Sequence, residues 1–195
     1  MKNFEVILVD NGSTDGSCAF VASQYSWVHI IELSENFGFS RAVNEGIKAA
    51  RAPYVLLLNN DTEVEPDFLK EMTEGLQRHK KAFSCQAKML QFHDREKMDD
   101  GGNYYCALGW AFAGGKEKSA KHYDKEKKIF SSCAGAAIYR KKIFEKIGYF
   151  DDEHFAYLED LDVGYRARIY GYENWYIPGA VVYHVGSGTS GSRYN

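Results

Sequence analysis

Short apolar runs alternate with amphipathic stretches along the first half of the chain. Runs rich in Val, Ile and Leu at 4–9, 28–33 and 54–58 each lead into polar side chains, which is typical of buried strands that stop at the rim of a sheet. Apolar spacing, with capping residues after the first run, predicts helices between and after the strands. Because strand and helix alternate, we expect parallel strands joined by right-handed crossovers. The expected helices cover residues 13–24, 37–51 and 66–78.

The second half of the chain loses this regular alternation. Residues 101–115 are rich in glycine and aromatic side chains, and we expect the charged stretch 116–128 to form a mobile surface loop rather than a specific anion site. The sequence therefore predicts an α/β fold with a Rossmann-like, mostly parallel sheet flanked by helices, followed by an irregular second half. The remaining patterns predict strands at 82–91 and 131–140, helices at 141–147 and 159–170, and strands near Trp175 and Val182.

Composition limits the class of protein and its partners. A chain of 195 residues with 45% hydrophobic and 15% aromatic residues has ample material for a core. The formal net charge of -3 offers no broad basic surface, so we expect no nucleic acid partner. No apolar run is long enough to span a bilayer, and Met1 leads directly into a strand, which predicts a cytoplasmic protein. The cysteines lack CxxC spacing, which favours buried thiols in a reducing cytosol, and they are Cys18, Cys85, Cys106 and Cys133.

The first two strand ends carry side chains that suit a nucleotide. Around the first turn, side-chain oxygens and free helix amides can hydrogen-bond a base, a ribose or phosphates, and the candidate residues are Asp10, Asn11, Ser13 and Asp15. The alternative is a capped turn with no ligand, and this turn alone leaves both open. The second strand leads into another polar helix start, where the candidates are Asn36, Gly38, Arg41 and Asn44. Arg41 can pair with a phosphate.

A metal site is predicted at the end of the third apolar run. Asn60 and Asp61 follow this strand, and a divalent ion on a diphosphate needs hard oxygen donors but often takes only one or two from protein. His184 follows a late apolar strand and can complete a Mn2+ or Mg2+ site. The alternatives are a capped turn at Asp61 and a packed strand histidine at His184.

Three carboxylates open the helix expected at 159–170. They belong to Glu159, Asp160 and Asp162, and the helix dipole favours their ionised forms while the neighbouring like charges oppose ionisation. Such opposed effects can tune a general base. The alternative is that acidic residues simply favour the first turn of a helix.

The order of these motifs is the most specific feature of the chain. They are the segments 9–16, 36–46, 58–62, 134–136 and 159–160, followed by His184. In this order they resemble family 2 glycosyltransferases, nearest to the rhamnosyltransferase-like branch that decorates bacterial surface polysaccharides. The resemblance spans nearly the whole chain. It implies a GT-A fold in one domain over 1–195, with a nucleotide-sugar donor half at about 1–90 and an acceptor half at about 91–195.

The resemblance also implies an activity and a role for each candidate residue. It implies an inverting transfer, in which an acceptor hydroxyl attacks the anomeric carbon of a UDP-, dTDP- or GDP-linked sugar while Mn2+ or Mg2+ holds the diphosphate. Asp10 and its turn match the nucleotide position, Asp61 the metal position, His184 the late metal-assisting histidine and Asp160 the catalytic base. The expected acceptor is a saccharide or a lipid-linked saccharide, which leaves room for peripheral association with the inner face of the plasma membrane.

The sequence departs from the family pattern at both ends. Relatives usually begin with a further strand and helix before the strand that opens this chain, and they commonly continue beyond the late histidine. We therefore expect a fragment or minimal form with an unpaired strand neighbour and a reduced nucleotide pocket. One rival hypothesis is a non-catalytic remnant that binds nucleotide or serves as an interaction module. Another is a nucleotidyltransferase, which would release pyrophosphate from a nucleoside triphosphate.

Overall fold

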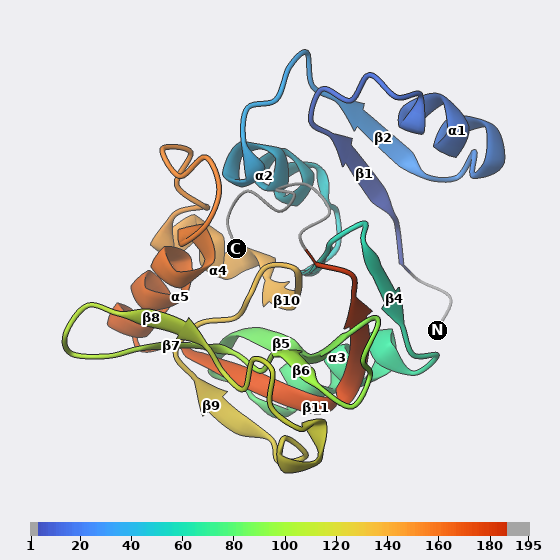
Figure 1. Cartoon of the computed structure of the whole chain (residues 1–195). Coiled ribbons are helices and arrows are strands. Elements are labelled where there is room, and N and C mark those ends of the chain that lie inside the picture. The colour runs from blue at the N-terminus through green and yellow to red at the C-terminus, as the bar shows by residue number, and fades with distance from the viewer. Residues whose placement is uncertain (1–3, 187–195) are drawn as a thin grey trace.

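The structure, a computed structural model, describes residues 4–186 and has an α/β fold (Figure 1). Its strands are β1 (Ile7–Asp10), β2 (His29–Glu32), β3 (Tyr54–Leu58), β4 (Thr62–Val64), β5 (Ala82–Gln91), β6 (Met98–Asp100), β7 (Asn103–Tyr105), β8 (Ala111–Ala113), β9 (Lys127–Ile129), β10 (Ala136–Arg140) and β11 (Glu173–His184). Its helices are α1 (Ser17–Gln24), α2 (Phe39–Ala49), α3 (Phe68–Arg78), α4 (Lys141–Ile147) and α5 (Glu159–Ile169), with a 3-10 turn at Ala120–His122.

The main sheet combines parallel and antiparallel pairs. Within the described residues its path is β3-β10-β5-β11-β4, with β6 added to β5 and β9 added to β11. β5 and β11 are parallel, whereas β10 runs antiparallel to both β3 and β5. β3, β5 and β11 therefore run in the same direction, and their carboxyl ends meet at one edge of the sheet. This edge carries the polar residues that follow β3 and β11.

β5 is the central strand because its sequence is apolar enough to be covered on both sides. Every residue from Ala82 to Leu90 is buried, and the strand has the bounds that the apolar run predicts. β5 pairs with β10 on one side and with β11 on the other. Near-continuous burial is the pattern expected of a strand with helices on both faces of its sheet.

Helices pack on both faces of the main sheet. The apolar side of α3, which includes Met72 and Leu76, forms one core cluster with β5, β10 and β11. On the other face, Ile47 of α2, Phe144 of α4 and Val163 of α5 surround Phe83 and Tyr139. Figure 1 shows the two helix groups on opposite sides of the strands. These layers confirm the expected α/β class.

β1 and β2 form a separate parallel pair, in register from Ile7 with His29 to Asp10 with Glu32. Figure 1 shows them with α1 at one end of the molecule, beside α2. Among residues 4–186, β1 has no strand partner other than β2, and β3 has none other than β10. Within the described residues, β1 and β3 therefore each have one edge without a strand partner, as expected from the sequence. Contacts between α2 and β1, including Gly46 against Val9, hold the pair against the rest of the fold.

Several element boundaries differ from the sequence prediction. α1 begins at Ser17 rather than at 13, because Gly16 takes a left-handed conformation and the Asp15 carboxylate accepts a hydrogen bond from the Ser17 amide at 3.0 Å. Thr62–Val64, where no strand was expected, pairs with β11 as β4. The strands expected near Trp175 and Val182 are a single strand, β11, with an irregularity between Ile177 and Val181.

The charged stretch 116–128 is built into the fold rather than forming a free loop. The Lys118 carbonyl accepts a hydrogen bond from the Met98 amide at 2.8 Å, and Ser119 forms a β-bridge with Lys97. The Lys88 ammonium, on the central strand, donates to the Ala120 carbonyl at 3.0 Å. The sequence prediction of a mobile loop is wrong here, because the pattern of charges gives no information about these long-range backbone contacts.

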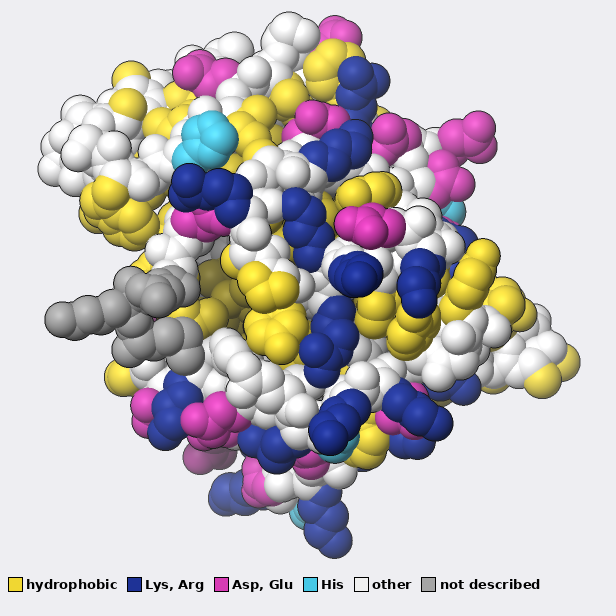
Figure 2. All heavy atoms as spheres, turned by 180° about the vertical axis from the view of Figure 1, so that it is seen from behind, with side chains coloured by type: hydrophobic (Ala, Val, Ile, Leu, Met, Phe, Trp, Pro, Cys, Tyr) yellow, Lys and Arg dark blue, Asp and Glu magenta, His cyan; other side chains and the backbone are white. Residues whose placement is uncertain are grey.

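β7 and β8 form a hairpin that projects from the body of the molecule at the left of Figure 1. From behind, hydrophobic side chains lie on the corresponding right-hand projection, and Lys and Arg side chains gather on the adjoining face (Figure 2). Opposite charges are therefore unevenly distributed over a chain whose net charge is only -3.

Gly38 makes a close backbone contact with the loop that precedes α5. It has φ 88° and ψ 169°, and an added Cβ would lie 2.6 Å from the Phe155 carbonyl oxygen. That carbonyl cannot simply move away, because it accepts a hydrogen bond from the Phe39 amide at 2.7 Å.

We expect Gly38→Ala to lower the free energy of unfolding by at least about 2 kcal/mol, since backbone strain and a steric clash add. Gly16→Ala is the matched control, because Gly16 also has positive φ, at 85°, but has open space around it. The control should lose only about 1 kcal/mol. Urea unfolding of both variants measures the difference, and equal losses would show that the contact with Phe155 is unimportant.

Candidate active site

Asp61 and His184 lie side by side at the edge where β3 and β11 end. Asp61 is in the turn between β3 and β4, and His184 is the last residue of β11. Antiparallel pairing places His184 opposite Thr62, and the Val185 amide donates to the Asp61 carbonyl at 3.0 Å. As a result, His184 Nε2 lies 3.3 Å from Asp61 Oδ1. Residues that are far apart in the sequence thus meet through strand pairing.

Asp99 fixes the other side of the His184 ring. Its Oδ2 lies 2.7 Å from His184 Nδ1, and Asp99 sits in β6. With the Nδ1 proton donated to this carboxylate, the Nε2 lone pair points toward Asp61. Sequence reasoning missed Asp99, because nothing in the segment 97–101 showed that β6 would pair with β5 next to His184.

The pair Asp61 and His184 fits a divalent metal ion. One carboxylate oxygen and one imidazole nitrogen form a donor set that Mn2+ accepts readily. Neighbouring ligands on an octahedral ion at ~2.1 Å are ~3 Å apart, close to the observed 3.3 Å. Among the described residues there is no group of three or more His, Cys, Asp or Glu side chains that could hold a metal. An ion here would therefore need further oxygen ligands, which a diphosphate and water can supply.

Asp160 lies in the first turn of α5, directly after a strained turn. Tyr157 and Leu158 both have positive φ, at 71° and 68°, which is uncommon for residues other than glycine. Such strain persists where the surrounding structure imposes it, often at functional sites. Burial raises the pKa of Asp160, and polar contacts with the Asn103 side chain and the Ala134 amide act in the opposite direction.

The neighbouring Glu159 is also buried. Its Oε2 has no hydrogen-bond partner among the described residues, and its exposed fraction is 7%. Burial, followed by the charge of Asp160, raises the pKa of Glu159 to about 7. At both Glu159 and Asp160 desolvation is the largest of the opposed effects, and it raises the two pKa values.

The segment 133–135 connects the metal-ligand candidates with Asp160. The Gly135 carbonyl accepts a hydrogen bond from the amide of Asn59, two residues before Asp61, at 2.9 Å. The preceding residue, Ala134, contacts Asp160 through its backbone amide. A side chain at Gly135 would be crowded, since an added Cβ would lie 3.2 Å from Asn59 Nδ2.

A buried hydrogen-bond network around Gln86 contacts segment 133–135. Gln86, on the central strand, donates to Asp100 Oδ1 at 2.8 Å and accepts from the Cys133 amide at 2.6 Å. Desolvation raises the pKa of Asp100 to about 6, and the charges of Asp160 and Asp99 add to the shift. The charge of Asp160 thus acts on Asp100, which is the chain neighbour of the Asp99 that holds His184.

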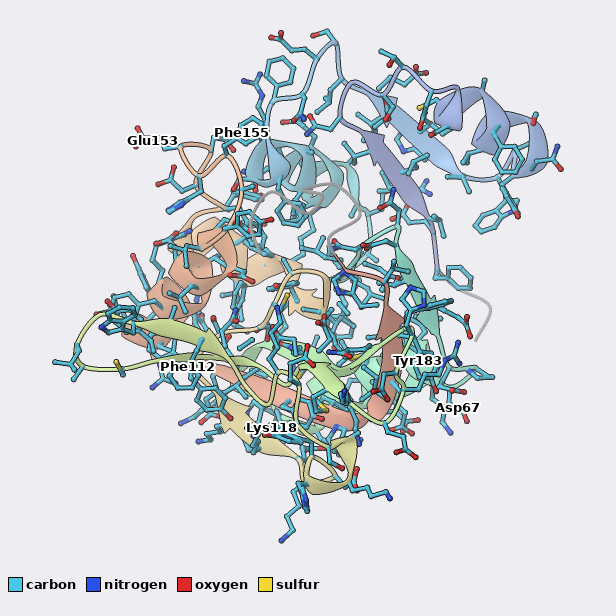
Figure 3. All side chains as sticks on the ribbon, viewed as in Figure 1. Asp67, Phe112, Lys118, Glu153, Phe155 and Tyr183 are labelled. Carbon is cyan, nitrogen blue, oxygen red and sulfur yellow. The ribbon has the colours of Figure 1, made fainter. Side chains whose placement is uncertain are left out.

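Hydrogen bonds join the two polar turns expected to bind a nucleotide. Asn11 Nδ2 donates to Asn36 Oδ1 at 2.8 Å and to the Gly38 carbonyl at 3.0 Å, while Asn11 Oδ1 accepts from the Phe37 amide. Asp10 is buried and its carboxylate accepts from the Ser13 amide at 3.0 Å. The turns after β1 and β2 therefore form one rim. The loop that carries Phe155 lies next to α2 (Figure 3).

The other donor-side candidates occupy different environments. Asp15 and Asn60 are exposed, and the Arg41 guanidinium lies over the Phe37 ring, 4.3 Å from its centroid. Asn44 is buried, and its side chain bonds both to the Phe150 backbone and, at 2.8 Å, to Asp152. Asn44 therefore ties α2 to the loop before α5. No hydrogen bond or ion pair recorded for residues 4–186 joins the rim of the first two strands to Asp61 or His184.

Solved structures share this fold. A structure of GalNAc-T7 with UDP, GalNAc and Mn2+ superposes with a TM-score of 0.74 at 13% identity, covering 92% of this chain and 37% of that chain. The fold is that of the GT-A glycosyltransferases. The family model for Glycosyl transferase family 2 matches residues 1–148, and the chain belongs to this family.

Two curated relatives illustrate the range of the family. An N-acetylglucosaminyl-diphospho-decaprenol L-rhamnosyltransferase of Mycobacterium tuberculosis is 25% identical over 92% of this chain and 66% of its own length. A poly-beta-1,6-N-acetyl-D-glucosamine synthase of Staphylococcus epidermidis is 25% identical over 97% of this chain and 45% of its own length. The chain thus spans less than two thirds of either relative. In the described part of the chain, no helix is long and apolar enough to cross a membrane.

Asp99→Asn should weaken metal binding by about 10- to 100-fold, because a neutral amide no longer orients the His184 ring with a negative charge. Calorimetric titration of Mn2+ in the presence of UDP measures the change. Asp94→Asn is the control, since Asp94 lies in the same segment but pairs with Lys97 at 3.0 Å on the surface. Unchanged Mn2+ affinity in Asp99→Asn would remove Asp99 from the site.

Metal binding should also weaken as the pH falls. The hydrogen bond and charge of Asp99, with the charge of Asp61, raise the pKa of His184 above its ordinary 6.5, although desolvation opposes them. A metal ion and a proton compete for Nε2, so affinity is full above this raised pKa and approaches a tenfold loss per pH unit, on the order of magnitude, below it. Mn2+ titrations from about pH 8 to about pH 6 test this. A flat profile, or an identical slope in His184→Gln, contradicts the assignment.

Proposed function

We propose that this chain carries out a metal-dependent inverting transfer of a sugar from a nucleotide donor to an acceptor hydroxyl. The donor is a UDP-, dTDP- or GDP-linked sugar, and the acceptor is a saccharide or a lipid-linked saccharide in bacterial surface polysaccharide synthesis. The observation that carries the proposal is the contact between His184 Nε2 and Asp61 Oδ1. Asp99 binds Nδ1 of the same ring, and the charge of Asp160 acts on the buried carboxylate of Asp100.

On the donor side, each group of residues has a proposed role. The joined turns that contain Asp10, Asn11, Asn36 and Gly38 bind the nucleoside, since they present a buried carboxylate, side-chain amides and backbone groups. Asp61 and His184 would hold Mn2+ or Mg2+, which neutralises charge that grows on the leaving diphosphate. The further donor contacts proposed here come from Ser13, Asp15, Arg41 and Asn60. Asn44 is not among them, because its buried side chain is bonded to Phe150 and Asp152.

On the acceptor side, Asp160 is proposed as the general base. An alcohol is a poor nucleophile unless its proton is removed, and general-base help contributes roughly 10²–10⁴ in rate. A pKa raised by burial makes Asp160 a better proton acceptor than an exposed aspartate, while Asn103 and the Ala134 amide orient the carboxylate. The proton of the acceptor hydroxyl moves to Asp160 as the oxygen attacks from the face opposite the leaving diphosphate.

The proposal extends to the organisation of the chain and its location. We propose one domain over 1–195, with the donor half at about 1–90 and the acceptor half at about 91–195. This division is supported by the placement of Asp61 before β5 and of Asp160 after it. We further propose a cytoplasmic protein that works at the inner face of the plasma membrane, where a lipid-linked acceptor would be met.

Asp160→Asn and Asp61→Ala should fail at different steps. Asp160→Asn should bind UDP and Mn2+ normally but lose transfer by about 10²-fold or more, because the amide cannot take a proton. Asp61→Ala should lose Mn2+-dependent UDP binding itself, because one metal ligand is gone. Calorimetry gives binding, and release of nucleoside diphosphate from a panel of sugar nucleotides gives turnover.

Asp162→Asn is the control for Asp160, because Asp162 lies in the same helical turn but pairs with Arg166 at 2.6 Å. Near-normal transfer by Asp160→Asn would exclude it as the base, and unchanged UDP affinity in Asp61→Ala would exclude the metal role. Absence of turnover with any donor favours the rival binding module. Release of pyrophosphate from a nucleoside triphosphate identifies a nucleotidyltransferase instead.

A further inference from the structure

An exposed apolar surface covers the hairpin of β7 and β8 and the outer side of α5. We call this surface the apolar edge. Leu108 and Trp110 at the hairpin tip are 85% and 72% exposed, and Ile169 of α5 is 66% exposed. Side chains of this size are normally buried, and a contiguous exposed group of them marks an interaction site. The apolar edge consists of Tyr105, Leu108, Trp110, Tyr165 and Ile169.

Aromatic contacts make the apolar edge continuous. The ring centroids of Tyr105 on β7 and Tyr165 on α5 are 6.5 Å apart, and both rings pack against Phe130 at 5.4 Å and 5.6 Å. Tyr165 and Ile169 are four residues apart on α5 and so share one face of the helix. Figure 3 places Phe112 on the projecting hairpin, where it stacks on Tyr104 on the face opposite to Tyr105. The Tyr105 face of the hairpin and the outer side of α5 therefore present a single surface.

The same two elements hold the proposed base. β7 begins with Asn103, whose side chain contacts Asp160, and α5 carries Asp160 in its first turn. The Asn103 amide also donates to the Ser131 carbonyl at 3.0 Å, which anchors the base of the hairpin. Whatever binds the apolar edge is therefore held at a fixed position relative to Asp160.

The charges around the apolar edge suit a partner that is apolar inside and negative at its surface. Residues 101–115 contain no charged side chain. On α5, Arg168 is a cation beside the apolar edge, and its guanidinium lies over the Phe130 ring at 4.9 Å, whereas Arg166 is paired with Asp162 at 2.6 Å. Figure 2 shows Lys and Arg side chains on the face that adjoins the apolar projection.

We propose that the apolar edge docks on an anionic phospholipid bilayer, with Leu108 and Trp110 inserted at the boundary between headgroups and acyl chains. Tryptophan and tyrosine favour this boundary, and nearby Lys and Arg attract anionic lipids. A projecting tip with an apolar end suits a penetrable surface better than a flat protein face. This inference rests on the proposed function, because docking here brings a membrane-anchored acceptor saccharide to Asp160.

Flotation of the full chain with phosphatidylcholine vesicles, with and without phosphatidylglycerol, tests the proposal. The wild-type chain should float with vesicles that contain phosphatidylglycerol. The Leu108→Ser/Trp110→Ser double variant should bind them about tenfold or more weakly, since two large apolar side chains no longer insert. The control is Trp27→Ser, because Trp27 is 62% exposed but lies outside the apolar edge, and its vesicle binding should equal that of the wild type.

Donor hydrolysis, measured as nucleoside diphosphate release in solution, separates this inference from the proposed function. Loss of flotation in the double variant with unchanged hydrolysis supports the docking site. Equal flotation of the double variant and the wild type overturns it, even if hydrolysis shows that the enzyme works. A wild-type dimer that the double substitution dissociates, without vesicle binding, also overturns it and assigns the surface to a second copy of the chain. If the wild type floats, the double variant does not, and neither hydrolyses any donor, the docking site is supported and the proposed activity is contradicted.

Discussion

The His184 ring, held between Asp61 and Asp99, is the interaction on which the rest of the site depends. It joins the turn after β3, the strand β6 and the end of β11. Because Asp99 binds Nδ1, the ring is oriented with Nε2 facing Asp61, which is the orientation that a metal-ligating histidine requires. Remove the pairing of β11 with β4 or of β6 with β5, and one of the three side chains would no longer reach the others.

The sheet makes this meeting possible. β3, β5 and β11 run in one direction, so that their carboxyl ends deliver polar residues to the same edge, and β4 turns back against β11 to place Thr62 opposite His184. The antiparallel strand β10 brings in the Ala134-Gly135 segment, through which Asp160 is tied to the same edge. The arrangement of the proposed site therefore depends on strand direction as much as on residue identity.

Local patterns in the sequence predicted the α/β class and the bounds of β3 and β5. They also predicted that Asp61 and His184 follow or end strands and that Asp160 lies in the first turn of a helix, while the chemical roles of these residues stay predictions. Asp99 escaped prediction, since its role arises from pairing between β5 and β6 rather than from its neighbours in sequence. The charged stretch 116–128 was misjudged for a similar reason. Its backbone contacts with Met98 and Lys88 are long-range, and charge alternation says nothing about them.

Electron spin-echo measurements of Mn2+ bound to the full chain with UDP test the central claim most directly, because they detect nitrogen coordinated to the ion. We expect coupling to one imidazole nitrogen in the wild-type chain and its loss in His184→Gln. His29→Gln, altered at an exposed histidine of β2, should retain the coupling. Bound Mn2+ without nitrogen coupling, or coupling that survives His184→Gln, would contradict the placement of the metal between Asp61 and His184.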